Sequence, residues 1–147
     1  FIELVDDWKN KGTQVVFTNG CFGLVHAGHI SYMAEAASLG DRLIIGLNAD
    51  SSVKLLKGPG RPINDQESRA ILLASLFFVD AVVIFDEETP LKMITALLPD
   101  ILAKGGDYAL DQIVGAKEVM ANGGEVKIIQ FVDGFSSTAI IKKIKHQ

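Results

Sequence analysis

Two histidines lie three residues apart where the chain passes from a predicted strand to a predicted helix. Residues 15–17 are β-branched and aromatic, as is typical of a buried parallel strand. From Ile30 onward, apolar residues recur at helical spacing. His26 and His29 fall between these patterns, close to the unpaired backbone N–H groups of a helix start, which attract anions. The spacing therefore predicts an anion-binding site with two titratable donors.

The same turn is rich in glycine. Gly20, Gly23 and Gly28 allow the backbone to approach a ligand closely. We therefore expect the turn to form part of a binding site and assign to ligand binding Asn19, Gly20, Cys21, Phe22 and Gly28.

The four residues H-A-G-H at 26–29 resemble the H-x-G-H signature of the nucleotidyltransferase superfamily, which includes glycerol-phosphate cytidylyltransferase and phosphopantetheine adenylyltransferase. The resemblance implies that His26 and His29 contact the phosphates of a nucleotide and act in catalysis. We expect at least one of them to be an imidazolium, since neighbouring anions favour the charged form.

Four further segments narrow the resemblance: L-K-G-P-G-R-P-I-N, A-K-G-G-D-Y, A-N-G-G-E-V-K-I and V-D-G-F-S-S-T-A-I-I. They are similar to adenylyltransferases that activate D-glycero-D-manno-heptose 1-phosphate, found alone or as the C-terminal half of a bifunctional kinase/adenylyltransferase. The resemblance implies AMP transfer from ATP to the sugar phosphate, giving ADP-heptose and pyrophosphate for lipopolysaccharide core precursors. Mg²⁺ would neutralise the leaving pyrophosphate.

The resemblance also carries residue roles. Lys54 and Lys57 would be catalytic cations on a mobile loop, and no residue is assigned to a protein-built metal site. The other residues assigned to nucleotide or phosphate binding are Asn48, Arg61, Arg69, Lys104, Gly105, Asp107, Ser136, Ser137 and Thr138. Two positions depart from the family pattern. Gly23 stands where an aspartate is usual, and Phe135 stands where a small residue is usual.

Strand and helix patterns alternate five times, which predicts an α/β fold with a doubly wound, five-stranded parallel sheet. The remaining strands are expected at 42–47, 81–85, 101–104 and 126–131, in a Rossmann-like single domain spanning residues 1–147. Residues 1–13 would be a helical N-terminal extension. Glycine-rich or basic turns follow four of the strands, and parallel strands end at one edge, so we expect one shared site.

Two segments between the strands carry specific expectations. The glycines and prolines of residues 51–64 predict an irregular, exposed loop. Asn64 is predicted to cap the next helix, whose buried stripe would consist of Ala70, Leu73, Ala74, Phe77 and Phe78.

Composition restricts the partners. The net charge is −4, and the basic residues cluster only near the end of the chain, which argues against nucleic acid. No apolar run approaches the ~20 residues of a membrane span, and no signal peptide is recognisable, so we expect a cytoplasmic protein acting on small molecules. Dimers are common among similar enzymes, so a homodimer is one expected arrangement. The chain begins at Phe1, which leaves open a preceding sugar kinase domain.

Other interpretations of the turn remain open from the residues alone. His26 and His29 could ligate a metal, Cys21 could pair with a histidine as a nucleophile, or the histidines could be inert. Because Gly23 removes a carboxylate, the chain could also be a weakened nucleotide-binding module. Among enzymes, the alternative is another cytidylyl- or adenylyltransferase, for example one acting on glycerol 3-phosphate.

Overall fold

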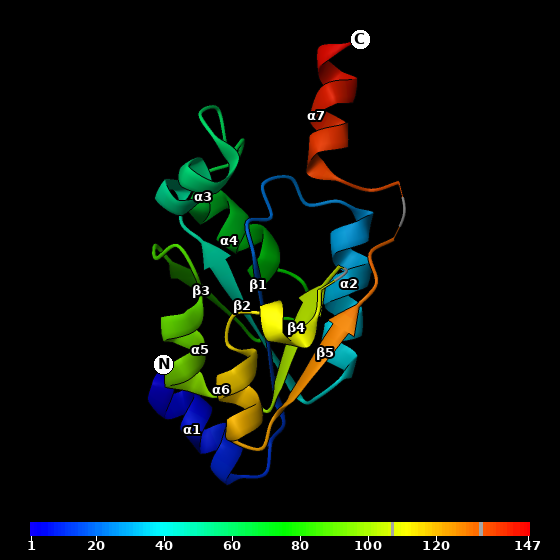
Figure 1. Cartoon of the computed structure of the whole chain (residues 1–147). Coiled ribbons are helices and arrows are strands. Elements are labelled where there is room, and N and C mark those ends of the chain that lie inside the picture. Colours follow the sequence, from blue (N-terminus) through cyan, green and yellow to red (C-terminus); the bar gives the residue numbers. More distant parts are fainter. Residues whose placement is uncertain (107, 133) are drawn as a thin grey trace.

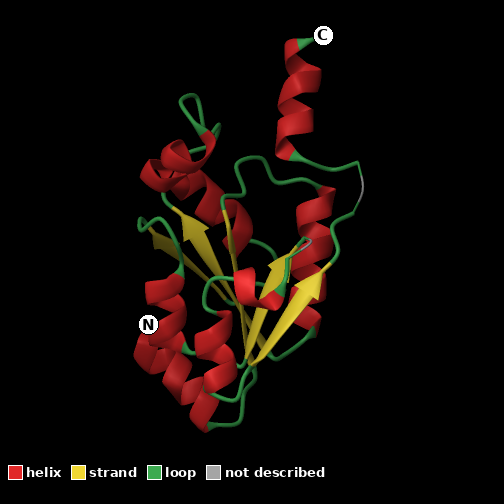
Figure 2. Cartoon of the chain, viewed as in Figure 1, coloured by secondary structure: helices red, strands yellow, loops and turns green. Residues whose placement is uncertain are grey.

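The computed structural model describes residues 1–106, 108–132 and 134–147 and contains one five-stranded parallel sheet (Figures 1 and 2). The strands are β1 (Val15–Gly20), β2 (Arg42–Asn48), β3 (Ala81–Phe85), β4 (Ile101–Gly105) and β5 (Glu125–Ile129). Their order in the sheet is β3-β2-β1-β4-β5, and every neighbouring pair is parallel. The predicted doubly wound α/β fold is confirmed.

The helices are α1 (Ile2–Asn10), α2 (Ala27–Ser38), α3 (Asp50–Lys57), α4 (Gln66–Ala74), α5 (Leu91–Leu97), α6 (Ala116–Ala121) and α7 (Ser137–Lys145), with a 3₁₀ turn η1 (Leu110–Gln112). One sheet face packs against α2 and α4, and the opposite face packs against α1, α5 and α6. No helix in the described part of the chain has the length and apolar character needed to cross a membrane.

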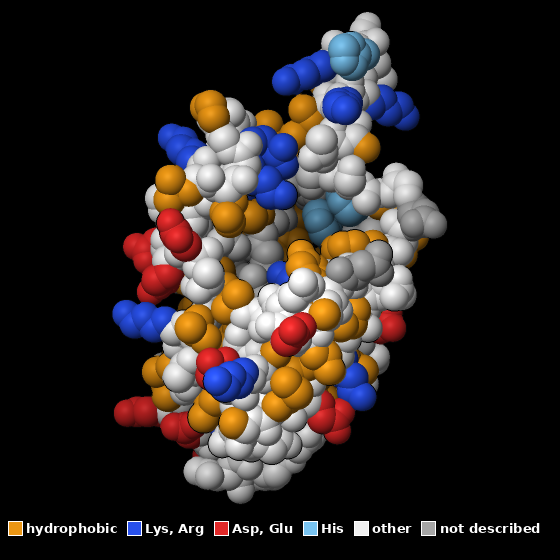
Figure 3. All heavy atoms as spheres, viewed as in Figure 1, with side chains coloured by type: hydrophobic (Ala, Val, Ile, Leu, Met, Phe, Trp, Pro, Cys, Tyr) orange, Lys and Arg blue, Asp and Glu red, His pale blue; other side chains and the backbone are white. Residues whose placement is uncertain are grey.

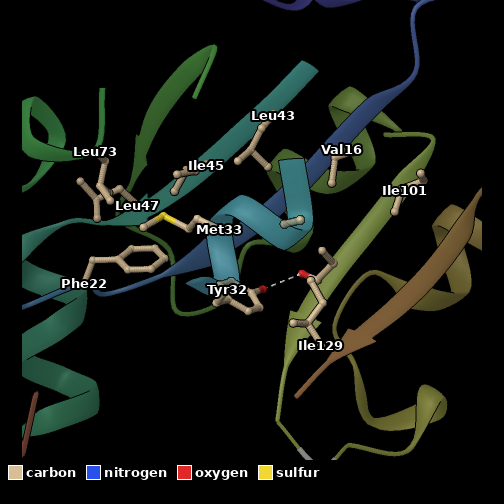
Figure 4. Close-up of a cluster of buried hydrophobic side chains, with 12 residues drawn as sticks. Val16, Phe22, Tyr32, Met33, Leu43, Ile45, Leu47, Leu73, Ile101 and Ile129 are labelled. Carbon is tan, nitrogen blue, oxygen red and sulfur yellow. Dashed lines mark hydrogen bonds between the residues drawn. The ribbon is translucent and has the colours of Figure 1, made fainter. Parts of the chain in front are cut away.

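Side chains alternate between two buried clusters because successive strand residues point to opposite sheet faces. Val16 and Ile45 belong to the cluster under α2, shown in Figure 4, while Phe17 and Ile44 belong to the cluster on the other face. Tyr32 of α2 fixes this helix to the sheet. Its hydroxyl pairs with the Thr18 hydroxyl and donates to the Ala103 carbonyl at 3.3 Å.

The sheet order creates a switch point beside β1. The chain leaves β1 toward β2 on one side and later returns at β4 on the other, so the connections following β1 and β4 diverge. Open α/β sheets bind ligands in the crevice that this divergence leaves at the carboxyl edge. The His26 and His29 turn follows β1 directly and therefore lies at that crevice.

The segment 51–64 is not the irregular loop that its composition predicted. Its first part is the helix α3, which buries Ser52 and Val53 and ends where Gly58 takes a φ of 91°. The glycines and prolines begin only after Lys57, so they end this helix without preventing it. Lys54 and Lys57 therefore lie on a helix and not on a loop.

The helix α4 also differs from prediction. Its N-cap is Asp65, whose side chain accepts a hydrogen bond from the Ser68 N–H, and not Asn64. The helix ends at Ala74, so the residues beyond leave its helical face, and Phe77 is 97% exposed. Only Leu73 of the expected stripe is fully buried; Ala74 is exposed, and Ala70 and Phe78 are partly buried.

The C-terminal part contains the last strand and a helix that extends away from the sheet. β5 ends at Ile129, two residues before the predicted end. The last helix, α7, extends away from the sheet in Figure 1, and none of its residues is buried. Ser137 and Thr138 in its first turn line a cavity at the carboxyl edge of the sheet.

Candidate active site

A cavity of about 910 Å³ opens at the carboxyl edge of the sheet. On one side it is bordered by the turn after β1, the end of β2, the C-terminal end of α3 and the segment that follows α3. On the other side lie the turns after β4 and β5 and the start of α7. The space-filling view shows the histidine side chains inside this hollow, with basic side chains nearby (Figure 3). The predicted site residues that line it are Asn19, Gly20, Cys21, Phe22, His26, Gly28, His29, Asn48, Lys57, Arg61, Lys104, Gly105, Ser136, Ser137 and Thr138.

His26 and His29 form a reciprocal cap at the start of α2. Each imidazole Nδ1 accepts a hydrogen bond from the other residue's backbone N–H at 3.3 Å. The two rings stack with 3.7 Å between their centroids and 18° between their planes. The helix begins at Ala27, so both rings belong to its N-terminal end, where free N–H groups add a positive potential.

This geometry fixes the protonation of both rings. Because each Nδ1 accepts a hydrogen bond, the proton of each neutral ring resides on Nε2. Burial lowers the pKa of His26, and burial, with a smaller contribution from the charge of His26, lowers the pKa of His29 to about 4. Without a bound anion, both shifts favour the neutral form of the ring, and the imidazolium expected beside bound phosphates stays a prediction.

Aromatic contacts hold the pair in place. Phe22, with a φ of 48°, sets its ring edge-on to His29 at 5.1 Å, and Phe135 stacks on His26 at 6.0 Å. A Cβ on Gly28 would lie 2.8 Å from the Phe135 Cβ and 3.0 Å from the His26 Nδ1. Glycine is required at position 28 for this packing.

Three cations approach the cavity from different elements: Lys57 from α3, Arg61 from the segment that follows it, and Lys104 from the end of β4. Burial raises the pKa of the Cys21 thiol and outweighs the opposite effect of these three cations and of Arg69. A thiol that stays protonated is a poor nucleophile. The described residues show no hydrogen bond between Cys21 and a histidine, so the geometry favours anion binding over a Cys–His nucleophile.

Burial also lowers the pKa of Lys104, whose ammonium lies 5.5 Å from the ring centroid of Tyr108.

Two of the predicted site residues that the structure describes lie outside the cavity wall. Lys54 is exposed and lies outside the lining. Arg69 is fully buried behind the wall, where its guanidinium donates to the carbonyls of Asn64, Cys21 and Asn48 and to the Asp50 carboxylate. Asp107 lies outside the described residues.

The start of α7 faces the same cavity as the start of α2. Ser136 caps the helix by accepting from the Ala139 N–H at 2.9 Å. The Ser137 hydroxyl donates to the Leu24 carbonyl in the histidine turn at 3.0 Å. Two helix N-termini therefore converge on one space, as the sequence pattern predicted.

The apolar wall of the cavity was not predicted from the sequence. It consists of Tyr32, Leu56, Leu102, Tyr108, Ile113, Val114, Phe131 and Val132, with Glu88, Thr89, Pro90 and Gln112 at its border. The available signal was the position of Tyr108 and Phe131 just after two strands that end at this edge. A flat ring system such as a nucleobase fits between surfaces of this kind.

The described residues contain no group of three His, Cys, Asp or Glu side chains able to hold a metal ion.

Residues 17–143 match the family model described as Cytidylyltransferase-like. The chain belongs to the cytidylyltransferase-like family. The match covers both histidines and most of α7, and it confirms the nucleotidyltransferase family and a nucleotide substrate. It also agrees with the donors that the two helix starts present to phosphate.

Relatives in this family match nearly the whole chain. It is 56% identical over 144 residues to the "Bifunctional protein HldE" of Vibrio atlanticus and 55% identical over 142 residues to that of Mesorhizobium japonicum. These alignments cover 98% and 97% of this chain but only 30% and 29% of those proteins. The chain thus spans less than a third of the length of these relatives.

Solved structures share the fold. A lipopolysaccharide core biosynthesis protein from Thermoplasma volcanium has a TM-score of 0.64 and 30% identity, covering 82% of this chain and 98% of that one. A pantoate-beta-alanine ligase from Francisella tularensis has a TM-score of 0.58 at 16% identity, covering 98% of this chain and 75% of that one. The second likeness concerns the fold alone.

Proposed function

We propose that this cytidylyltransferase-like domain transfers AMP from ATP to D-glycero-β-D-manno-heptose 1-phosphate, releasing pyrophosphate and forming ADP-heptose for lipopolysaccharide core precursors. The observation that carries the proposal is the convergence of the His26–His29 pair and the start of α7 on one cavity. The heptose is supported by the four sequence segments that resemble heptose 1-phosphate adenylyltransferases and by the high identity to the HldE proteins.

The reaction joins two anions. An oxygen of the sugar phosphate attacks the α-phosphorus of ATP, the new O–P bond forms, and the electron pair of the broken α–β bond leaves with pyrophosphate. The second pKa of a phosphate monoester is near 6, so the nucleophile is ionised at neutral pH and needs no general base. Catalysis then consists of alignment and charge stabilisation.

The residues supply these two effects from fixed positions. The Nε2–H groups of His26 and His29 would donate to oxygens of the reacting phosphate, and their neutral form costs little to bury. Lys57, Arg61 and Lys104 would offset the charge of the phosphates. Ser136, Ser137 and Thr138 would donate to phosphate oxygens at the start of α7.

The remaining components belong to the same proposal. Mg²⁺ would enter bound to the phosphates of ATP, as part of the substrate. The base and ribose would lie against the end of β4 at Lys104 and Gly105, beside the Tyr108 ring, with Asp107 and Asn48 assigned to the same nucleotide. We also propose a cytoplasmic location, a homodimer, and a sugar kinase as a fused or separate partner.

A pyrophosphate-release screen tests the proposal. Each nucleoside triphosphate is combined with heptose 1-phosphate, glycerol 3-phosphate and other sugar phosphates, and the product is identified by mass. We expect the highest kcat/KM for ATP with heptose 1-phosphate. His29→Asn should lose about 100- to 1,000-fold in kcat, whereas His146→Asn, at an exposed histidine beyond α7, should retain full activity.

Two results would contradict this assignment. Preference for CTP with glycerol 3-phosphate would identify a different transferase of the family. Tight ATP binding without pyrophosphate release from any acceptor would identify a nucleotide-binding module. One observation favours the nucleotide-binding module as the second candidate function. Gly23 is buried and carries no carboxylate.

A further inference from the structure

Three polar side chains that line the cavity have no part in the proposed function. Glu88 and Thr89 belong to the connection between β3 and α5, and Gln112 ends the 3₁₀ turn η1. The cavity volume of about 910 Å³ lies near the upper end of the range of about 300–1,000 Å³ that is typical of small-molecule sites. The cavity therefore leaves room for a second substrate beside ATP.

The two segments that carry these side chains lie on the sheet face opposite α2. β3 leads into α5 and η1 leads into α6, and both helices pack against the face that α2 does not cover (Figure 1). The segments are neighbours, since a Cβ built on Gly115 would lie 2.8 Å from two side-chain atoms of Ile94 in α5. We call the part of the cavity that is lined by Glu88, Thr89, Gln112, Ile113 and Val114 the α5–α6 sector.

Glu88 distinguishes this sector from the rest of the cavity. It is the one carboxylate among the described residues that line the cavity. The ion pairs found among the described residues do not include it. A carboxylate repels phosphate and accepts hydrogen bonds from hydroxyl groups. The part of a substrate that binds beside Glu88 is therefore uncharged and carries hydroxyl groups.

Thr89 and Gln112 add donors in fixed orientations. The Thr89 Oγ1 accepts a hydrogen bond from the Leu91 N–H at 3.5 Å, so its hydroxyl proton can donate to a ligand. The Gln112 Oε1 accepts from the Ala109 N–H at 3.3 Å, so the NH₂ group of this side chain is the part that can donate. One charged acceptor with two neutral donors suits the hydroxyl groups of a sugar.

The direction of attack decides which substrate binds in this sector. The proposed function places the phosphates of ATP against the starts of α2 and α7, which Ser137 joins by donating to the Leu24 carbonyl at 3.0 Å. In a displacement at the α-phosphorus, the attacking and the leaving oxygen lie roughly in line. The attacking oxygen therefore comes from the side opposite the pyrophosphate, which is the side of α5 and α6.

We propose that the sugar of the acceptor binds in the α5–α6 sector. Glu88 accepts hydrogen bonds from the sugar hydroxyl groups, and Thr89 and Gln112 donate to them. The inference rests on the proposed function for the reaction and adds the residues that select the acceptor.

Steady-state kinetics of pyrophosphate release test the proposal in Glu88→Gln and Thr89→Val. ATP and heptose 1-phosphate are varied separately, so that each substrate gives its own KM. We expect each variant to raise the KM of heptose 1-phosphate by about 10-fold, the loss typical of one hydrogen bond. The KM of ATP and the kcat at saturation should stay unchanged, because the lost contact binds the sugar equally before and during the reaction.

Glu87→Gln is the matched control. Glu87 is the neighbouring residue with the same side chain, but it lines a separate hollow beside α5 and lies 3.8 Å from the Lys92 Nζ. Its replacement should leave both KM values unchanged. Circular dichroism establishes that all three variants are folded.

Two results would refute the sector as the acceptor site. Folded Glu88→Gln could keep the wild-type KM for heptose 1-phosphate, or it could raise the KM of ATP instead, which would place the ribose or the triphosphate beside Glu88. In both cases, formation of ADP-heptose by the wild type would leave the proposed function standing.

The opposite combination is also decided by the same variants. If the wild type releases pyrophosphate only with another acceptor, the proposed function fails, and a Glu88-dependent KM for that acceptor retains the sector. If no acceptor reacts, titration calorimetry with heptose 1-phosphate decides. Binding that Glu88→Gln weakens would retain the sector without the reaction, and absence of binding would overturn both.

Discussion

The imidazoles of His26 and His29 stack at 3.7 Å, and each Nδ1 accepts the other residue's backbone N–H at 3.3 Å. The pair therefore serves two purposes at once. It satisfies two donors at the start of α2, and it directs both Nε2 atoms away from the cap. A single arrangement both stabilises the helix end and prepares the donors.

This arrangement predicts the tautomers of both rings. Near pH 7, nitrogen-15 correlation spectra should show His26 and His29 protonated at Nε2 and unprotonated at Nδ1. An Nδ1–H tautomer at either position would mean that the reciprocal cap does not exist in solution.

The cap also predicts how stability depends on pH. Burial lowers the pKa of His29 from 6.5 to about 4 in the folded chain, so between these values the unfolded chain binds more protons. The contribution of His29 to the free energy of unfolding should be complete above pH 6.5, and the free energy of unfolding should decrease as the pH falls toward 4. Urea unfolding from about pH 7 to about pH 5 avoids most carboxylate titration. The decrease should be smaller in His29→Asn, and an unchanged slope in that variant would contradict the assignment.

Arg69 is predicted to support the site without touching a substrate. Its side chain is fully buried and donates to the Asn64, Cys21 and Asn48 carbonyls, which belong to three different segments around the cavity. Arg69→Leu should leave these acceptors unpaired and lower the free energy of unfolding by about 3 kcal/mol or more. Urea denaturation measures this. The partly exposed Arg42→Leu should cost less than about 1 kcal/mol, so equal losses would refute the role of Arg69.

Much of this fold follows from local sequence patterns. Alternating apolar strands and helices predicted the parallel sheet, and the change of period after the two histidines predicted the helix start that the structure shows as α2. These signals are local, since strand burial and helix starts depend on a few neighbouring residues. The end of α4 was mispredicted because the spacing of Phe77 continues a helical stripe that the backbone leaves at Ala74.

Other features needed the sheet order, which no local pattern contains. Arg69 was assigned to nucleotide binding, yet the neighbouring ends of β1 and β2 bring carbonyls around it that use its donors. Tyr108 and Phe131 line one cavity because β4 and β5 are neighbours. The position of Arg61, whose buried Nε has no hydrogen-bond partner among the described residues, depends on contacts between segments about 40 residues apart, as seen in the Asn64 to Gly23 hydrogen bond.

Gly28 gives the sharpest test of the geometry around the histidines. The Cβ of Gly28→Ala would lie 2.8 Å from the Phe135 Cβ and 3.0 Å from the His26 Nδ1, so either the ring stack or the reciprocal cap must shift. We expect kcat for pyrophosphate release to fall by about 10- to 100-fold, as for a small misplacement of a reacting group, with a modest loss of stability of about 1 kcal/mol.

The comparison variant for this test is Gly46→Ala in β2. Its Cβ would lie 2.6 Å from the Phe17 Cζ in the core. It should lower the free energy of unfolding by about 1–3 kcal/mol while kcat per folded molecule stays close to that of the wild type. Full turnover in Gly28→Ala, measured alongside a destabilised Gly46→Ala, would show that catalysis does not depend on the packing between Phe135 and His26. The role given to the capped histidine pair would then have to be abandoned.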